Sequence, residues 1–527
     1  MARGVPSAGT RARIVWLCLV WLCLAAGLAA PASATARELP LGPGWLPETR
    51  AVSPVAPGVT YTRIERGFAT PRDFYTVDVA LTATRAEARA LRRRLRDAGY
   101  AARVERVRRR AFDDPRPGPL GYLVRAGAFS GKAEADSLAE ELVAAGFADA
   151  DAVFTGEDGT PTTGPWVLYV LEIDPAQYGG SIVPALATDV IPGRELLSSL
   201  AGRSGALAAL NGGYFVISDV DGTEGDLAGV SVVDGRLVSE AVNGRTSLVL
   251  PDRTGEGAFI DALTTRDVAV AGDGARRELD GLNRAPGLIR SCGGSGGDEP
   301  TERPKHDFTC TDASELIRFD PVFGAATPPG PGFEAVLDAG GVVTELRASR
   351  GGPIPPGGAV LAGTAEAADW LAAHAQPGSR VSTRLRLAGE RGPLALGPGA
   401  GVVNGGPRLL RHGRKDIPAY TEGFVWPEDP AFFYHFGVRR NPRTLAGLTA
   451  DGRLLLVAID GRHPGFSVGA SFVESAGVLR ALGAADGVNL DGGGSTTFTL
   501  GSALVNRPSD DTGERPIGDA LLLLGTP

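Results

Sequence analysis

Four polar segments, each following an apolar run, carry residue types that can bind or hydrolyse a polyhydroxyl or phosphate ligand. They are Asn211-Gly-Gly-Tyr-Phe215, Asn404-Gly-Gly-Pro407, Asp460-Gly-Arg462 and Asn489-Leu-Asp-Gly-Gly-Gly-Ser-Thr-Thr497. An Asn or Asp at a strand end followed by glycines lets the backbone bend sharply while a ligand approaches closely. Asn-Gly and Asp-Gly are also ordinary hairpin turns, and for Asp460-Gly461 that interpretation has the same weight as the functional one.

The segment from Asn489 to Thr497 is the most specific of the four. Three consecutive glycines cost backbone entropy that a simple turn does not require, and the following Ser495, Thr496 and Thr497 add hydroxyl groups. This combination suits a sugar or phosphate ligand. Asp491 is the leading carboxylate of the segment, although its side chain can instead satisfy the amides of its own turn.

The order of these segments resembles the phosphodiester glycosidase family over about residues 166–527. The resemblance is carried by Asn211–Phe215, Arg440–Thr444, Asp460–Arg462 with Ser467, Glu474, Asn489–Thr497, Asn506–Pro508 and Arg515–Gly518. That family includes the lysosomal enzyme that removes N-acetylglucosamine from a mannose 6-phosphodiester. The resemblance implies hydrolysis of a sugar C1–O–phosphate bond, and it is looser between Asp221 and Leu410, where Pro/Gly-rich insertions lie.

The leaving group of such a reaction sets what the site needs. Most glycosidases use two carboxylates, whereas a phosphate monoester, with a second pKa of about 6, leaves with little acid help. One base or nucleophile, groups that bind hydroxyls, and a cation for the phosphate are then sufficient. We expect catalytic carboxylates at Asp491, Glu474 and Asp460, and bidentate phosphate contacts from Arg443 and Arg462. The remaining expected substrate-binding residues are Asn211, Gly212, Asn404, Gly405, Asn489, Gly492, Ser495 and Thr496.

Glu474 has two interpretations of equal weight. It matches a family position, and Ser471–Glu474 is also a capping box that opens an apolar helix ending at Gly483. Asp460 and Asp491 are in addition candidate ligands of a divalent cation, but oxygen ligands this scattered do not specify a metal. The histidines lack metal-ligand spacing.

The N-terminus predicts an exported protein. Arg3, Arg11 and Arg13 precede an apolar run over residues 14–30, and small residues at 32–34 provide a cleavage site, which predicts a signal peptide over 1–36. A retained anchor is the less favoured alternative. We therefore expect a secreted or cell-wall-associated protein with no stable membrane anchor. In that compartment Cys292 and Cys310 predict one disulfide rather than half of a metal site.

A duplicated pattern over residues 72–155 predicts a small domain. Strands at 74–81, 102–107, 122–128 and 152–154 and helices at 85–98 and 132–145 give the order βαββαβ. Residues 122–147 resemble the SPOR domain, which implies binding to peptidoglycan glycan strands. The Arg-dense stretch 85–110 is a candidate surface for an anionic wall polymer, with a solvated basic face as the alternative. The net charge of −8 gives no case for nucleic acid.

The rest of the chain is expected to fold as a larger, strand-rich α+β domain over 166–527. It follows a lead segment (37–71), the small domain and a linker (156–165). Strands are predicted at 167–173, 207–210, 230–233 and 247–250, and helices at 365–374 and 472–482.

Three functions are compatible with this organisation. The leading one is a secreted hydrolase of sugar-1-phosphodiester bonds, of the N-acetylglucosamine-1-phosphate type, that acts on wall or extracellular polysaccharide and is anchored by the SPOR-like domain. The second is a catalytically inactive wall protein that binds glycan or peptidoglycan. The third, a phosphodiesterase that breaks the P–O bond, lacks its expected two-metal His/Asp signature. Retention of all the family-matched polar residues together favours the first.

Overall fold

The computed structural model describes residues 37–242, 244–287, 289–290, 298–300, 309–426 and 428–526. The signal peptide predicted over 1–36 lies outside the described residues. Within these ranges, no helix is both long and apolar enough to cross a membrane. Residues 38–527 form one compact unit.

The predicted βαββαβ domain is confirmed. Its elements are β3 (Tyr75–Thr82), α1 (Arg85–Asp97), β4 (Ala102–Val107), β5 (Gly121–Phe129), α2 (Lys132–Ala144) and β6 (Asp151–Phe154). The strands form an antiparallel sheet in the order β4–β5–β3–β6, and both helices pack on one apolar cluster that includes Val77 and Val124. Helix α1 begins at a capping box, in which Thr84 and Glu87 each accept the other's backbone N–H.

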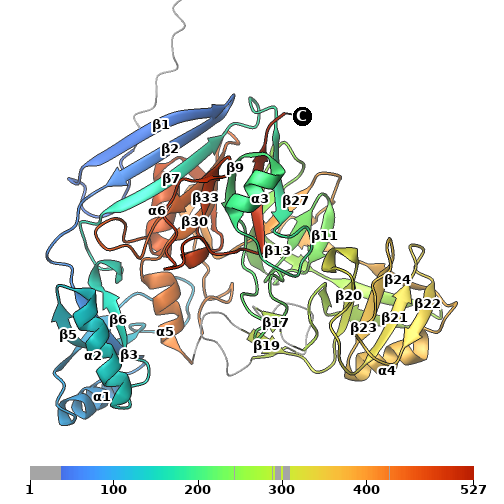
Figure 1. Cartoon of the computed structure of the whole chain (residues 1–527), viewed down its shortest axis with the longest axis horizontal. Helices are drawn as coiled ribbons and strands as arrows, with labels where there is room; N and C mark the ends of the chain where they lie inside the picture. Colours follow the sequence, from blue (N-terminus) through green and yellow to red (C-terminus); the bar gives the residue numbers. More distant parts are fainter. Residues whose placement is uncertain are drawn as a thin grey trace, which may run out of the picture. The chain divides into compact units, whose positions relative to one another are not determined.

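Eight antiparallel strands form the main sheet, in the order β1–β2–β7–β31–β30–β32–β28–β29 (Figure 1). Their bounds are β1 (Glu48–Ala56), β2 (Val59–Arg66), β7 (Trp166–Ile173), β28 (Arg408–Arg411), β29 (Arg414–Lys415), β30 (Arg443–Thr449), β31 (Leu454–Ile459) and β32 (Ala484–Asn489). Strand β7 is buried on both faces, because Trp166 and Leu168 enter one apolar cluster while Val167 and Tyr169 enter another. The sheet is therefore an inner layer of the molecule.

The segment 37–71, assigned from the sequence to a lead, supplies two strands of this sheet. Strand β2 pairs with β7 along its whole length, from Val59 opposite Ile173 to Arg66 opposite Trp166. The Arg66 side chain is buried and donates to the carbonyls of Leu41 and Pro43. Residues 38–66 are thus integral to the C-terminal fold.

A five-stranded sheet in the order β34–β33–β9–β35–β8 packs on one face of the main sheet. Its strands are β8 (Ser181–Leu186), β9 (Ala206–Asn211), β33 (Phe498–Leu500), β34 (Ala503–Leu504) and β35 (Asp519–Leu524). Leu210 and Leu521 share an apolar cluster with Tyr169 of the main sheet. The other face is covered by α6 (Phe472–Ala481), whose Phe472 and Leu479 are buried.

The remaining strands form smaller sheets between residues 231 and 404. A seven-stranded sheet holds β10 (Ser231–Val233), β11 (Arg236–Ser239), β12 (Arg245–Leu250), β13 (Phe259–Thr265), β25 (Leu387–Gly389), β26 (Gly392–Pro393) and β27 (Gly401–Asn404). A three-stranded sheet holds β14 (Asp267–Ala271), β15 (Arg276–Leu279) and β24 (Val381–Arg384). A five-stranded sheet holds β16 (Gly281–Leu282), β20 (Leu316–Phe319), β21 (Phe333–Leu337), β22 (Val343–Arg347) and β23 (Ala359–Gly363). Another three-stranded sheet holds β17 (Ile289–Arg290), β18 (Glu299–Pro300) and β19 (Thr309–Thr311). The helices outside the small domain, besides α6, are α3 (Leu197–Ser204), α4 (Ala365–His374) and α5 (Pro430–Phe433), the last continued by a π-helical turn, Tyr434–Val438. The α+β, strand-rich fold is confirmed, and each strand and helix predicted after residue 166 is present within a few residues.

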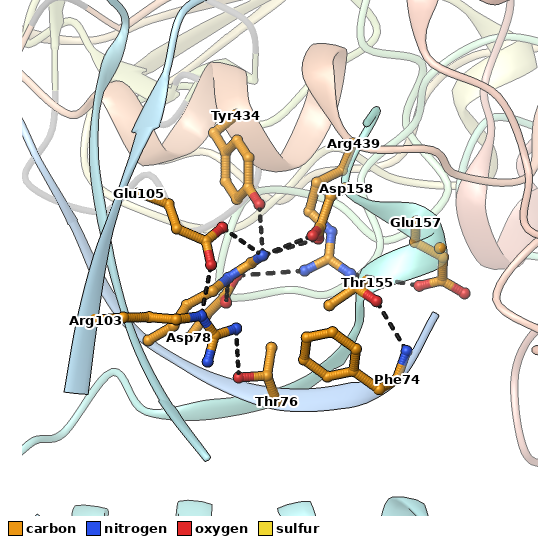
Figure 2. A network of polar contacts seen from close by, with 12 residues as sticks. Phe74, Thr76, Asp78, Arg103, Glu105, Thr155, Glu157, Asp158, Tyr434 and Arg439 are labelled. Atoms are coloured by element: carbon orange, nitrogen blue, oxygen red, sulfur yellow. Dashed lines mark hydrogen bonds and ion pairs between the residues drawn. The ribbon is translucent and has the colours of Figure 1, made fainter. Parts of the chain in front are cut away.

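The small domain contacts the C-terminal part through a buried polar network (Figure 2). Arg125 donates to Asp78 (2.7 Å), to Asp158 (2.6 and 2.8 Å) and to the hydroxyl of Tyr434 (3.1 Å). Arg439 lies within 3.6 Å of a second oxygen of Asp78. The network joins β3 and β5 to the π-helical turn more than 300 residues later.

The segment 156–165, predicted to be a linker, is largely buried where the two parts meet. Glu157 lies 3.4 Å from Arg439, and its backbone carbonyl accepts the amide of Arg440. The guanidinium of Arg440 donates to the carbonyls of Gly156 and Thr160. Burial raises the pKa of Glu157 to about 7. These contacts attach the SPOR-like domain firmly to the larger part.

Candidate active site

The Gly-rich turn after β32 is built so that polar groups approach its backbone. A Cβ on Gly492 would lie 2.8 Å from the carbonyl oxygen of Pro442, and Gly493 has a left-handed φ of +61°. A Cβ on Gly494 would overlap the guanidinium of Arg515 and the carboxylate of Asp510. Each of the three glycines is therefore required by its surroundings.

Two guanidinium groups flank this turn. Arg462 Nη2 lies 3.4 Å from the position of a Cβ on Gly493 and donates to Asn441 Oδ1 over 3.0 Å. Arg462 is exposed, and its φ of +59° is a conformation that a non-glycine residue rarely adopts. Arg515 forms a two-point ion pair with Asp510, at 2.7 and 3.0 Å. Arg462 lies next to Gly493 and Arg515 next to Gly494, so the turn has a cationic edge suited to phosphate.

A second carboxylate, Asp519 at the start of β35, lies beside Asp491. Asp519 Oδ1 accepts the amide of Gly213 over 2.9 Å, and a Cβ on Gly212 would come within 2.5 Å of the Asp519 carboxylate carbon. Asp519 Oδ2 is buried and has no hydrogen-bond partner in the described part of the chain. Burial, together with the negative charge of Asp491, raises the pKa of Asp519 to about 7. The absence of side chains at Gly212 and Gly213 thus allows the Asp519 carboxyl group to enter the site.

Asp491 itself is partly exposed, at the tip of the turn. Its Oδ1 accepts the amide of Gly492 over 2.9 Å. Its backbone is fixed by Gly212 and Asn211, since its amide donates to the carbonyl of Gly212 and its carbonyl accepts Asn211 Nδ2 over 2.8 Å. The two carboxyl groups therefore differ in exposure, and burial raises the pKa of Asp519, an arrangement suited to an acid–base pair.

The three predicted asparagines are brought together, but their side chains bond the protein. Asn211 Oδ1 accepts the hydroxyl of Thr444 (2.6 Å) and the amide of Thr497, and Asn404 Oδ1 accepts the amide of Tyr214 (2.8 Å). Asn489 Nδ2 donates to the hydroxyl of Tyr214 and to the carbonyls of Gly406 and Leu490. All three are buried. They hold the turns in place around Tyr214, and Asn489 Oδ1 is buried without a hydrogen-bond partner among the described residues.

Gly405 and the hydroxyls of the Gly-rich segment also lie in this arrangement. A Cβ on Gly405 would lie 2.7 Å from the carbonyl oxygen of Asn489, which explains how closely these two turns pack. The hydroxyls of Ser495 and Thr496 are buried and lack a hydrogen-bond partner among the described residues. Buried polar groups are normally bonded, so these two hydroxyls are available to a ligand or to water.

Asp460 and Glu474 are engaged with the protein. Asp460 is buried and accepts the hydroxyl of Tyr169 (2.9 Å), Asn506 Nδ2 and the amide of Arg507 (3.1 Å each), and burial raises its pKa to about 6. The capping box at Ser471 and Glu474 is present, and Arg440 binds both Glu474 oxygens. Although burial disfavours its charge, Arg440 and Ser471 hold the pKa of Glu474 below its usual range. Both carboxylates fix the turns around the site.

Arg443 points away from the Gly-rich turn. Its guanidinium donates to the carbonyls of Ala470 and Phe436 and lies 4.5 Å from the ring centre of Phe472. The side chain is buried, and burial lowers its pKa to about 10. Of the two arginines predicted to bind phosphate, only Arg462 flanks the turn.

The remaining predictions concern a metal and a disulfide. In the part of the chain that the structure describes, no group of three His, Cys, Asp or Glu residues is arranged to hold a metal ion. The Asp460 oxygens, moreover, already accept the bonds of three donors. Cys310 is buried in β19, and Cys292 lies outside the described residues, so the disulfide stays a prediction.

Two residues of the site were missed in the sequence. Arg515 belongs to the tail that carries the family resemblance, and Asp519 follows it at the head of an apolar strand. The available signal for Asp519 was its place as a single carboxylate between the family-like segment Arg515–Gly518 and an apolar strand. Nothing local indicates that β35 lies beside β9 and so brings Asp519 to the Gly212–Gly213 turn.

The raised pKa of Asp519 has a consequence for stability. In the unfolded chain an Asp titrates near 3.9, so between about pH 4 and 7 only the folded state keeps this proton and stability falls as pH rises. We expect Asp519→Asn to raise the thermal midpoint at pH 8, by about 2 °C or more, and to change it little at pH 4. Thermal unfolding at both pH values measures this. The same change at exposed Asp511 serves as control, and an equal gain in both variants at pH 8 would contradict the expectation.

Comparison with known proteins identifies the same two families that the sequence resembles. Residues 331–524 match the phosphodiester glycosidase family, and residues 71–150 match the SPOR domain. A Burkholderia pseudomallei protein described as exported is 36% identical, and its crystal structure superposes with a TM-score of 0.83 over 93% of this chain and 98% of that one. No curated protein matches the sequence.

Two more distant structures also match. A hypothetical protein from Synechocystis shares the fold, with 19% identity and a TM-score of 0.53 over 90% of this chain and 76% of that chain. The catalytic domain of zebrafish N-acetylglucosamine-1-phosphodiester alpha-N-acetylglucosaminidase matches with 17% identity and a TM-score of 0.35, over 70% of this chain and 80% of that chain.

Proposed function

Because this chain belongs to the phosphodiester glycosidase family and carries a SPOR domain, we propose that it hydrolyses sugar-1-phosphodiester bonds in cell-wall or extracellular polysaccharide. The bond is of the N-acetylglucosamine-1-phosphate type, and cleavage occurs between C1 and oxygen. The observation that carries the proposal is the Asp491–Asp519 carboxyl pair beside a turn flanked by Arg462 and Arg515.

The site divides the reaction between these groups. Arg462 and Arg515 bind the phosphate and stabilise the negative charge that it gains as the C1–O bond breaks. Asp491, which is accessible, activates a water molecule or attacks C1 directly. Asp519 has a pKa of about 7, so near neutrality it can hold a proton next to the reacting atoms. Because the leaving phosphate monoester is a weak base, no strong acid is needed.

The SPOR domain would place this activity on the cell wall. Family members bind peptidoglycan glycan strands, and the similar Burkholderia protein is described as exported, which supports a secreted or wall-associated location. Helix α1 exposes the basic side chains Arg89, Arg92 and Arg93, which are a candidate contact for an anionic wall polymer.

The position of bond cleavage provides the test. The whole mature chain is incubated with N-acetylglucosamine-α-1-phospho-6-mannose in ¹⁸O water, and the products are analysed by mass spectrometry. Label in the released sugar is expected. Label in the phosphate would overturn the proposal in favour of a phosphodiesterase, and an inactive protein that a glycan column still retains would support the binding protein.

A further inference from the structure

A cluster of arginines lies on the open face of the sheet formed by β15, β14 and β24, in the part of the chain that is yellow to pale green in Figure 1. Arg266, Arg276, Arg384 and Arg386 line a cavity of about 860 Å³ there, and all four are exposed. Among the residues that the structure describes, none provides these side chains with an ion pair or a hydrogen bond. In a chain with a net charge of −8, this is a local concentration of unpaired positive charge.

The strand register places these charges against each other. Val268 lies opposite Arg384. Two residues further along the strand pair, Arg266 lies opposite Arg386, and the amide of Arg266 donates to the Arg386 carbonyl over 3.0 Å. In the adjoining strand pair, Val270 lies opposite Arg276. Residues in these positions share one face of the sheet. Like charges directly opposite each other destabilise a sheet, and a bound anion would remove that cost.

The cavity continues into a second one of about 640 Å³. Leu237, Leu385 and Leu396 line both, so together they form one elongated groove with an apolar floor. The second cavity adds Arg236 and Arg318.

The groove also contains acidic groups, which limit its positive charge. Asp320 pairs with Arg318 at 3.1 Å and Arg236 at 3.5 Å, whereas Glu278 is exposed opposite Val268. Asp267 is buried, and one of its oxygens accepts the amide of Arg386 over 2.8 Å. The four arginines on the open face therefore exceed the carboxylates beside them, although Glu278 lies in the same cross-strand row as Arg384, with Val268 between them.

We propose that this groove is a secondary binding site for the polymer substrate, a glycan chain with phosphates in its repeating unit. Phosphate groups bind Arg266, Arg384 and Arg386, since a guanidinium matches two phosphate oxygens at once. The less polar faces of the sugar rings lie on the leucine floor. The inference rests on the proposed function, because a substrate of sugar phosphates supplies such anions at regular intervals. Holding the chain here raises the local concentration of its other linkages near the same molecule.

A pair of matched double variants tests the site in the full-length mature protein. R266S/R386S removes two opposed charges and so relieves repulsion in the folded sheet. R414S/R480S removes two arginines that are exposed elsewhere, and it serves as the control for net charge. Binding of medium-chain inorganic polyphosphate is measured by calorimetric titration at about 0.15 M salt. Affinity is expected to fall on the order of tenfold in R266S/R386S and to stay within about twofold in the control.

Activity assays separate this inference from the proposed function. With a sugar-phosphate polymer, kcat/KM is expected to fall in R266S/R386S, whereas hydrolysis of N-acetylglucosamine-1-phospho-mannose stays unchanged. Failure of the wild type to hydrolyse either substrate would reject the proposed function, while the polyphosphate titration would still report on the groove. The secondary site is overturned if the wild type does not bind polyphosphate, if both double variants bind it equally, or if only anionic phospholipid vesicles are bound.

Discussion

Asp491→Asn is expected to lower kcat by on the order of 10² or more, because it removes an accessible carboxylate, next to Asp519, from the arginine-flanked turn. The substitution preserves local structure, since an Asn Oδ1 can still accept the amide of Gly492. It also removes the like charge that contributes to the raised pKa of Asp519, so that pKa should fall in the variant. Steady-state kinetics on a small sugar-1-phosphodiester and NMR titration of the Asp519 carboxyl measure the two effects.

Asp451→Asn, in an exposed surface turn, is the matched control for this experiment and should retain full turnover. If Asp491→Asn also retained it, Asp491 would be reassigned to the structure of its turn. A lowered Asp519 pKa with unchanged kcat would show that the two carboxyl groups interact without Asp491 taking part in the reaction.

The buried network between the SPOR domain and the C-terminal part is the second place where a large effect is expected. Arg125→Met should lower the free energy of unfolding by on the order of 3–5 kcal/mol. The substitution leaves the buried Asp158 without the cation that binds it and leaves the buried Asp78 with only Arg439, at 3.6 Å. Removing one partner of a buried ion pair costs more than the pair itself contributes, because the remaining charges stay desolvated.

Urea unfolding of the full chain, followed by tryptophan fluorescence, provides the measurement. Arg96→Met is the control, because Arg96 pairs with Asp97 at 2.8 Å on the exposed surface of α1, where such pairs contribute about 1 kcal/mol or less. Equal losses in the two variants would mean that apolar contacts alone hold the domains together.

The parts of the fold that were predictable are those with local signals. Helix α4 was placed at its observed bounds, residues 365–374, and the SPOR elements to within one or two residues, because amphipathic spacing and turn residues lie within each element. Strand β2 was missed because its partner β7 follows about 100 residues later, and β1 pairs with β2 rather than with β7. The linker was interpreted from its Gly and Pro content, and the burial of Glu157 depends on Arg439, which is 282 residues away in the sequence.

The same limit applies to the candidate site. The turn at residues 489–497 was recognised because its glycines and hydroxyls are contiguous in the sequence. The sequence does not show that Arg443 and Arg462 differ in orientation. Arg443 is held by Phe436 and Phe472, whereas Arg462 is held by the backbone conformation of its own turn. Asp519 becomes relevant only through its contact with Gly213, 306 residues earlier.

The order of strands in the main sheet has a consequence for the kinetics of folding. Strand β7 pairs on one side with β2 and on the other with β31, so that Tyr169 and Asp460, 291 residues apart, form a hydrogen bond. Contacts of such long sequence separation slow folding, because a large loop must close before they form. The N-terminal hairpin and β7 must therefore remain incomplete until residues 454–459 emerge during synthesis. In the meantime the free edge of β7 is exposed to aggregation, and protection by a chaperone suits this topology.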